Sequence, residues 1–493
     1  MMPLIHFRKA TLPIIVLFSI VCFGLAPLVW AVIPPDGGYP GGNTAEGQNA
    51  LLTLTTGGFN TAVGYLSLRS VTTGSFNTAI GAGTLLANTA DQNTAIGTAA
   101  LLSNTTGLFN TAAGALALFS NSTGSGNTAI GDDALLNNTT GADNTAMGID
   151  SLIFNTIGNF NTAIGGSALR TNTTGQRNTA TGSEALFHNT IGNDNTAGGF
   201  ETLENNDTGS GNTAMGTDAL FNNTTGNGNT ATGVDSLNHN TTGFENTANG
   251  SGALFSDTTG AGNTADGVRA LSGNTTGNGN TAIGFEALIN NTTGSGNLVL
   301  GSGAGGGITT ANNVICIGPA LPGANVSDSC FIAKIYQRQV GNDNLPVQID
   351  SFGKLGTTVS SRRFKHDIAP MDQVSEVILA LRPVTFRYNS DSENKPQFGL
   401  IAEEVADVNA ALVVYDKDGK PYSVRYDQVN AMLLNEFLKE HRTVENQESR
   451  MQQQAATIAR QQKQIDALTA GLQRVSDQLA LSKSAPRAVI SNQ

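Results

Sequence analysis

The chain has 493 residues with a formal net charge of −12, and only 13% of its residues are charged. This length is too great for one compact domain, so we expect several parts. The negative balance argues against nucleic acids and anionic membrane surfaces as partners. Ordinary hydrophobicity combined with 59 glycines excludes a disordered polyelectrolyte and indicates a repeat with many tight turns.

The N-terminus is typical of an export signal. Arg8 and Lys9 precede an apolar run from Leu12 to Trp30, and Ala31 ends an acceptable cleavage site. We expect residues 1–31 to be removed, which would leave a secreted or cell-surface protein. The alternative is an uncleaved anchor, because the run is almost long enough to span a bilayer. No other segment of the sequence is predicted to reach a membrane.

Three cysteines are present. Cys22 lies within the expected signal, so Cys316 and Cys330 would be the only two in the exported chain. They form either a disulfide, which the oxidising exterior permits, or two buried thiols. The sequence favours neither alternative.

A 17-residue repeat with the consensus N-T-A-x-G-x-x-A-L-x-x-N-T-T-G-x-x fills residues 43–305 in sixteen units, one of them a residue shorter. The third place is Ala and the ninth is Leu in the first fifteen units, and the fifth place is Gly in all sixteen units. The fourth place varies from Ile to Asp. We therefore expect the third and ninth places to point inward and the fourth to point outward.

The segment N-T-A-x predicts a short strand, and the fifth-place Gly and the T-T-G segment predict turns. One unit cannot bury a core alone, but stacked units place Leu on Leu and align Asn and Thr in hydrogen-bonded ladders. The sequence therefore predicts a mainly β chain with a β-solenoid rod roughly 75 Å long at about 4.8 Å per coil.

These units resemble the head repeats of trimeric autotransporter adhesins, in which three chains each form a β-roll. The resemblance implies a homotrimer, and one Leu per coil is a thin core that favours burying a second face between chains. The C-terminal part departs from that family, which finishes in a membrane β-barrel.

After the repeats we expect a β-rich neck over residues 306–357. Its predicted strands are Val314–Ile317, Phe331–Ile335 and Val347–Ile349. The following segment predicts a small α+β domain, with a helix near 371–381 followed by a strand, and a hairpin turn at Asp418-Gly419.

The last helix carries a heptad pattern that predicts a trimeric coiled coil over residues 433–482. The a positions are Phe437, Val444, Met451, Ile458, Ile465, Leu472 and Leu479. The d positions are Leu433, Glu440, Gln447, Gln454, Gln461, Leu468 and Val475. Gln in several d layers weakens the coil and indicates a specified register. Residues 483–493 are expected to form a disordered tail.

Three motifs in order resemble the intramolecular chaperone domain of the peptidase S74 family, found at the ends of phage tailspikes such as endosialidases. Ser360–Ile368 matches the family's S-D-x-R-x-K-x-x-I. Gly399–Val405 matches G-L-I-A-Q-E-V with Glu403 in place of Gln, and Val424–Leu433 matches the entry to the terminal helix. We therefore expect a chaperone and autoprotease domain over residues 358–432.

The resemblance implies a Ser–Lys dyad. Ser360 would attack the carbonyl of Val359, and Lys365 would act as the base, so that the chain breaks between Val359 and Ser360. A lysine base must be unprotonated, and burial or nearby positive charge favours that form. We expect these conditions only in the folded assembly.

The residues around the dyad are expected to support it. Arg363 matches the family's Arg, and His366 is either an assisting group or a surface residue. Ser361 replaces the family's Asp, which leaves open whether this copy cleaves.

The predicted parts are 1–31 signal, 32–42 linker, 43–305 rod, 306–357 neck, 358–432 chaperone, 433–482 coiled coil and 483–493 tail. The predicted function is an exported trimeric fibre whose chaperone domain assists folding and cuts itself off. It would act on its own chain, with no external substrate, cofactor or metal.

The first alternative is a non-cleaving structural or adhesive surface fibre with a permanent coiled-coil cap. Its rod would bind a surface glycan or host ligand that the sequence does not identify. A glycan hydrolase needs paired carboxylates at a defined site. It is disfavoured, because we expect the acids of the repeats to occur singly at varying positions, such as Asp150, Glu184, Asp235 and Glu286.

Overall fold

The computed structural model describes residues 39–336, 338, 345–350 and 352–483. The chain divides into two compact units, residues 1–340 and residues 341–493. The expected signal at 1–31, with Cys22, lies outside the described residues, as does nearly all of the expected tail at 483–493.

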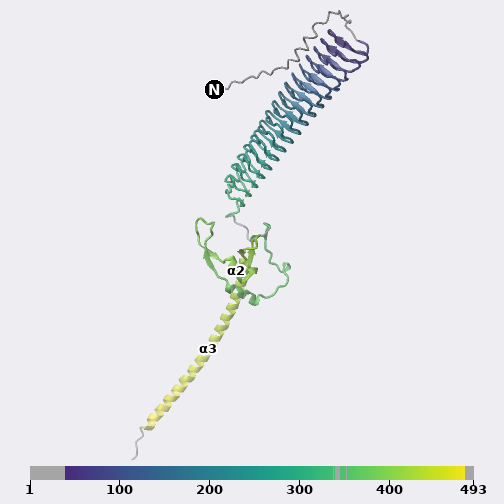
Figure 1. Ribbon diagram of the computed structural model, residues 1–493. Coiled ribbons are helices and arrows are strands. Elements are labelled where there is room, and N and C mark those ends of the chain that lie inside the picture. Colours follow the sequence, from purple (N-terminus) through teal and green to yellow (C-terminus); the bar gives the residue numbers. More distant parts are fainter. Residues whose placement is uncertain (1–38, 337, 339–344, 351, 484–493) are drawn as a thin grey trace, which may run out of the picture. The chain divides into compact units, whose positions relative to one another are not determined.

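The first unit is a β-solenoid in which every coil contributes one three-residue strand to a parallel sheet (Figure 1). The strands are β1 (Thr44–Glu46), β2 (Thr61–Val63), β3 (Thr78–Ile80), β4 (Thr94–Ile96), β5 (Thr111–Ala113), β6 (Thr128–Ile130), β7 (Thr145–Met147), β8 (Thr162–Ile164), β9 (Thr179–Thr181), β10 (Thr196–Gly198), β11 (Thr213–Met215), β12 (Thr230–Thr232), β13 (Thr247–Asn249), β14 (Thr264–Asp266), β15 (Thr281–Ile283), β16 (Leu298–Leu300), β17 (Ile315–Ile317) and β18 (Cys330–Ile332). Each strand pairs with the next in register, so that Thr162 lies beside Thr179 and Ala163 beside Ala180.

The apolar core follows the predicted pattern. From the second coil onward, the third-place residues and the ninth-place leucines are fully buried, as at Ala163 and Leu169, and the eighth-place Ala168 joins them. The fourth-place Ile164 is exposed on the outer face, because successive side chains of a strand take opposite faces. The predicted mainly β fold with a solenoid rod is confirmed.

Buried asparagines complete the interior of the rod. At the first place, Asn178 donates from Nδ2 to Asn161 Oδ1 over 3.2 Å. At the twelfth place, Asn189 donates to Asn172 Oδ1 over 2.8 Å and to the carbonyl of Gly192 over 3.1 Å. These ladders provide hydrogen bonds to polar groups that would otherwise be costly to bury. They therefore stabilise the interior of the rod together with the single Leu of each coil.

The rod extends further than the repeat predicted. β17 pairs in parallel with β16, and β18 pairs with β17, so two of the strands expected in a separate neck continue the solenoid. The reason is the inward position of their middle residue: Cys316 is buried in the column that Ala occupies in earlier coils.

Neither alternative for the cysteines holds in full. Cys316 and Cys330 are free thiols, the first buried and the second exposed. Cys330 lies beside Ile315 in the β17–β18 register, and Cys316 lies beside Phe331. Their side chains therefore take opposite faces of the sheet, which prevents a disulfide within the chain.

The described residues of the second unit form three two-stranded antiparallel sheets and several helices. Its elements are β19 (Val347–Ile349), β20 (Leu355–Thr357), η1 (Arg362–Phe364), η2 (Asp372–Ala380), β21 (Val384–Phe386), β22 (Gln397–Gly399), α2 (Ala402–Val408), η3 (Ala410–Leu412), β23 (Val413–Tyr415), β24 (Pro421–Val424) and α3 (Tyr426–Lys483). The predicted α+β pattern is confirmed, and the helix expected near 371–381 is the 3₁₀ helix η2. The β23–β24 hairpin turns at Gly419 with φ +76°, as predicted.

A small core and a polar contact tie these elements to the start of α3. Val405, Leu412 and Val413 are buried and pack against Val429 and Met432 of the helix. Ser375 of η2 is fully buried; it accepts a hydrogen bond of 2.7 Å from Asn435 Nδ2 and donates to Glu436 Oε1. The first turns of α3 therefore belong to the α+β domain.

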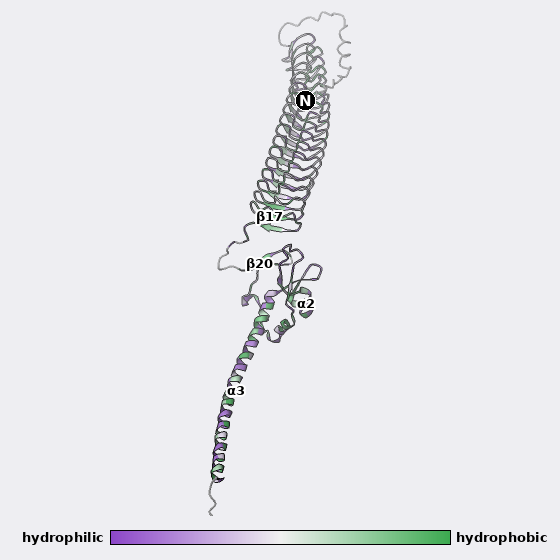
Figure 2. Cartoon of the chain, turned by 90° about the vertical axis from the view of Figure 1, so that its left-hand side faces the viewer, coloured by the Kyte–Doolittle hydropathy of each residue, from purple (hydrophilic) through white to green (hydrophobic). Residues whose placement is uncertain are grey.

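The rest of α3 has an unpartnered apolar stripe. The seven a-position residues named above are between 40% and 70% exposed, and Figure 2 shows hydrophobic residues recurring along a mainly polar helix. Such exposure is expected of a coiled-coil strand viewed as a single chain. Over the described residues, no helix combines the length and hydrophobicity needed to cross a membrane.

Candidate functional site

The predicted dyad lies just after the β19–β20 hairpin. The chain leaves β20 at Thr357, runs extended to Ser361, and makes the single 3₁₀ turn η1. The turn is closed by hydrogen bonds from the Phe364 amide to the Ser361 carbonyl (3.0 Å) and from the Lys365 amide to the Arg362 carbonyl (3.1 Å). This fold-back brings Lys365 towards Ser360.

The two side chains meet: Lys365 Nζ donates a hydrogen bond of 3.3 Å to Ser360 Oγ. Both residues are exposed, and so is Val359 on the other side of the expected cleavage bond. The two groups lie close to each other, slightly beyond the roughly 2.6–3.2 Å that separates a nucleophile from its base. The single chain lacks the burial that favours an unprotonated lysine.

The neighbouring predicted residues point elsewhere. The Arg363 guanidinium lies 4.6 Å from the Phe364 ring centroid. His366 Nδ1 contacts Asp367 Oδ2 at 2.8 Å with both side chains almost fully exposed. Ser361 precedes η1 without a side-chain capping hydrogen bond. The structure therefore brings together Ser360 and Lys365, and over the described residues the side chains of the other three make no hydrogen bond or ion pair with the dyad.

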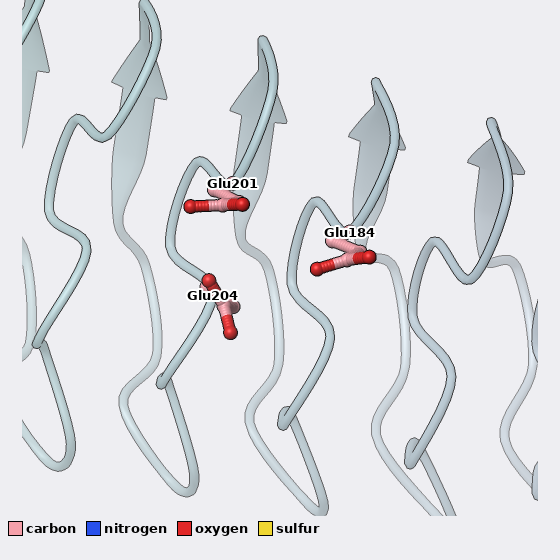
Figure 3. A group of neighbouring side chains, drawn as sticks. All are labelled: Glu184, Glu201 and Glu204. Atoms are coloured by element: carbon pink, nitrogen blue, oxygen red, sulfur yellow. The ribbon is translucent and has the colours of Figure 1, made fainter. Parts of the chain in front are cut away.

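A second group of polar residues, which the sequence analysis did not assemble, lies on the rod. Glu184, Glu201 and Glu204 each place a carboxylate oxygen within 4.8 Å of the others (Figure 3). Burial, followed by the negative charges of Asp218 and Glu184, raises the pKa of Glu201. All these side chains are partly exposed.

The arrangement corrects the expectation that the acids of the repeats vary in position. Counting from each first-place Asn shows that Asp150, Glu184, Asp235 and Glu286 share the seventh place, so in-register stacking aligns them in one column. Counting positions within the 17-residue repeat is therefore enough to find this column in the sequence. An acidic column alone does not identify a ligand. Asp218 Oδ1, beside Glu201, is buried without a hydrogen-bond partner over the described residues, but the Asp218 side chain is itself only partly buried.

Comparison with known families identifies the segment that contains the dyad. Residues 360–414 match the Peptidase S74 family, described as the chaperone of endosialidase. The match begins at Ser360 and includes Lys365, so the predicted resemblance is confirmed for this segment. In the sequence, the solenoid rod precedes the matched segment.

A search of curated proteins and a search of solved structures found no match. The likeness of the repeats to adhesin heads therefore stays a prediction that rests on their sequence.

Proposed function

We propose that this protein is an exported homotrimeric fibre whose C-terminal chaperone domain assists trimer folding and then removes itself. The observation that carries the proposal is the 3.3 Å contact between Lys365 Nζ and Ser360 Oγ at the start of the family match. The family's chaperone role and the unpartnered heptad stripe of α3 support a trimer.

The proposed cleavage uses only the chain's own groups and water. Ser360 Oγ attacks the carbonyl carbon of Val359, and Lys365 takes up the hydroxyl proton. The Val359–Ser360 peptide bond breaks as the Ser360 nitrogen receives that proton and becomes a free amine. Water then hydrolyses the ester between Val359 and Oγ, which leaves a carboxylate on Val359 and restores the hydroxyl.

Assembly supplies the control in this proposal. Lys365 is exposed in the single chain. Packing of neighbouring chains around the β20–η1 segment would bury it and favour the neutral amine. Cleavage would then follow trimer formation, so that only assembled fibres lose the chaperone.

The alternative function is a fibre that keeps its coiled-coil cap. It is favoured by Ser361, which replaces the family's Asp, and by the exposure of both dyad side chains. In this case the domain would assist assembly without cleaving, and the rod would act as a structural or adhesive surface fibre.

The self-cleaving fibre would release a C-terminal fragment, whereas the fibre that keeps its cap would not. We expect intact mass and N-terminal sequencing of the purified full-length protein to give a fragment that begins at Ser360. Ser360→Ala should abolish the fragment because it removes the nucleophile. The matched control Ser361→Ala keeps the nucleophile and should still yield the fragment.

Uncleaved trimers of the wild-type chain would establish the alternative. The same cut in Ser360→Ala would assign the cleavage to another protease.

A further inference from the structure

The twelfth place of the repeat forms a buried ladder of asparagines. From Asn104 onward, the Nδ2 of each asparagine donates to Oδ1 of the preceding coil, as in Asn223 to Asn206 (2.7 Å) and Asn240 to Asn223 (2.8 Å). The second Nδ2 hydrogen goes to a carbonyl in the same coil, as from Asn240 to Gly243 (3.1 Å). Every rung therefore needs a donor that points to the rung before it.

Asp257 interrupts this ladder. It is fully buried at a twelfth-place position, and its Oδ1 accepts a hydrogen bond of 2.6 Å from Asn274 Nδ2, as an asparagine Oδ1 would. Its Oδ2 stands where the other rungs carry NH₂. Over the described residues, Asp257 Oδ2 and Asn240 Oδ1 are both buried without a hydrogen-bond partner.

In the described part of the rod, the ladder has one further acceptor without a hydrogen-bond partner, and the end of the ladder explains it. Asn291 Oδ1 also lacks a partner, but Asn291 is the last rung, because Ile308 occupies the twelfth place of the next coil. The Asn240–Asp257 step is therefore an interior break, where two oxygen atoms face each other and a charged carboxylate would have no hydrogen to donate.

No nearby charge compensates a carboxylate at this position. The titratable and charged residues of the two adjacent coils are Asp235, His239, Glu245, Asp266 and Arg269. Over the described residues, none of them makes a hydrogen bond or ion pair with Asp257; His239, for example, contacts the carbonyl of Phe255 (3.0 Å). An unpaired buried charge is costly, and a group in this situation takes its neutral form.

We propose that Asp257 carries a proton in the folded rod and donates it from Oδ2 to Asn240 Oδ1, which makes this step a pH-sensitive rung of the solenoid. The neutral carboxylic acid has the shape of asparagine and one hydrogen in the required place. Loss of the proton leaves a buried charge facing the lone pairs of Asn240, so the rod is weakest between these two coils at alkaline pH.

The direction in which the stability of the rod changes with pH follows from the raised pKa of Asp257 in the folded state. Burial raises the pKa of Asp257 to about 7, against the opposing hydrogen bonds from Asn274 and the Gly260 amide. An aspartate in an unfolded chain has a pKa of about 3.9. Between these values the folded state binds more protons, so the free energy of unfolding is greatest below about pH 4, falls as pH rises, and levels off above about pH 7.

The substitution Asp257→Asn tests this proposal in the full-length protein. Asparagine restores both hydrogens, so the variant should lose the part of the decline in melting temperature that the wild type shows between about pH 5 and pH 8. It should also melt above the wild type at about pH 8. Asn223→Asp places a second such rung in the same ladder and should steepen the decline.

Infrared spectroscopy gives a readout that does not depend on unfolding. The difference spectrum of wild type minus Asp257→Asn should show the C=O band of a protonated carboxylic acid at about pH 5, and this band should vanish as pH rises through about 7. Absence of the band at pH 5 would overturn the proposal. So would parallel melting curves for wild type and Asp257→Asn across the whole pH range.

Discussion

The fifth-place glycine is the residue on which the stacking of coils depends most directly. Gly165 has φ +136°, a region that side-chain-bearing residues rarely adopt. A Cβ built on it would lie 2.4 Å from the carbonyl oxygen of Gly182 in the next coil. Backbone therefore meets backbone at this place, which explains why every unit keeps Gly there.

Gly165→Ala should lower the stability of the rod markedly. The strained backbone alone costs on the order of 1–3 kcal/mol, and the clash with Gly182 adds to it because neither atom belongs to a flexible side chain. Thermal unfolding of the purified protein checks the change. The neighbouring Gly166 is the matched control, since a Cβ there would meet nothing within 4 Å; Gly166→Ala should melt close to wild type, and equal losses in both variants would refute the argument.

At this scale the sequence predicted which side chains are buried but not how the backbone achieves it. The ninth-place leucines have left-handed φ, such as +51° at Leu169, and the seventh-place residues do too, such as Glu184 at +59°. This conformation costs roughly 1–2 kcal/mol per residue, so no propensity rule places leucine there. Only the stacking of identical coils, which buries each Leu, explains it.

At the scale of elements, the exposed apolar heptad positions of α3 indicate that this helix packs against other chains. The sequence predicted the helix and its apolar positions because seven-residue spacing is a strong signal. It placed the coiled coil at 433–482, and α3 begins at Tyr426, within the segment that matched the entry to the terminal helix. The sequence did not show that these first turns pack against the α+β domain, because their contacts, with Ser375 among them, come from distant parts of the chain.

Ile458→Asp should prevent stable trimers, because it would place a buried charge in an apolar layer of the coiled coil. Ala456→Asp adds the same charge two residues away, off the predicted a and d positions, and should leave the trimer intact. Analytical ultracentrifugation of both full-length variants distinguishes them. A trimeric Ile458→Asp protein would show that the stripe does not hold the chains together.

At the scale of the whole molecule, the sequence predicted the order of parts and the pairing of Ser360 with Lys365, because repeats and motifs are local signals. It misplaced the end of the rod, since β17 and β18 lack the consensus and are recognised as coils only by pairing with β16. It also did not show that the dyad is open to solvent in a single chain, because exposure depends on tertiary and quaternary packing.

The most direct test of the account is native mass spectrometry of the assembled wild-type protein. A fibre that has removed its chaperone should have the mass of three chains that each end at Val359, with the fragment from Ser360 onward recovered separately. A folded assembly in which every chain still reaches the C-terminal residue would contradict self-cleavage. A single-chain mass would contradict the trimer.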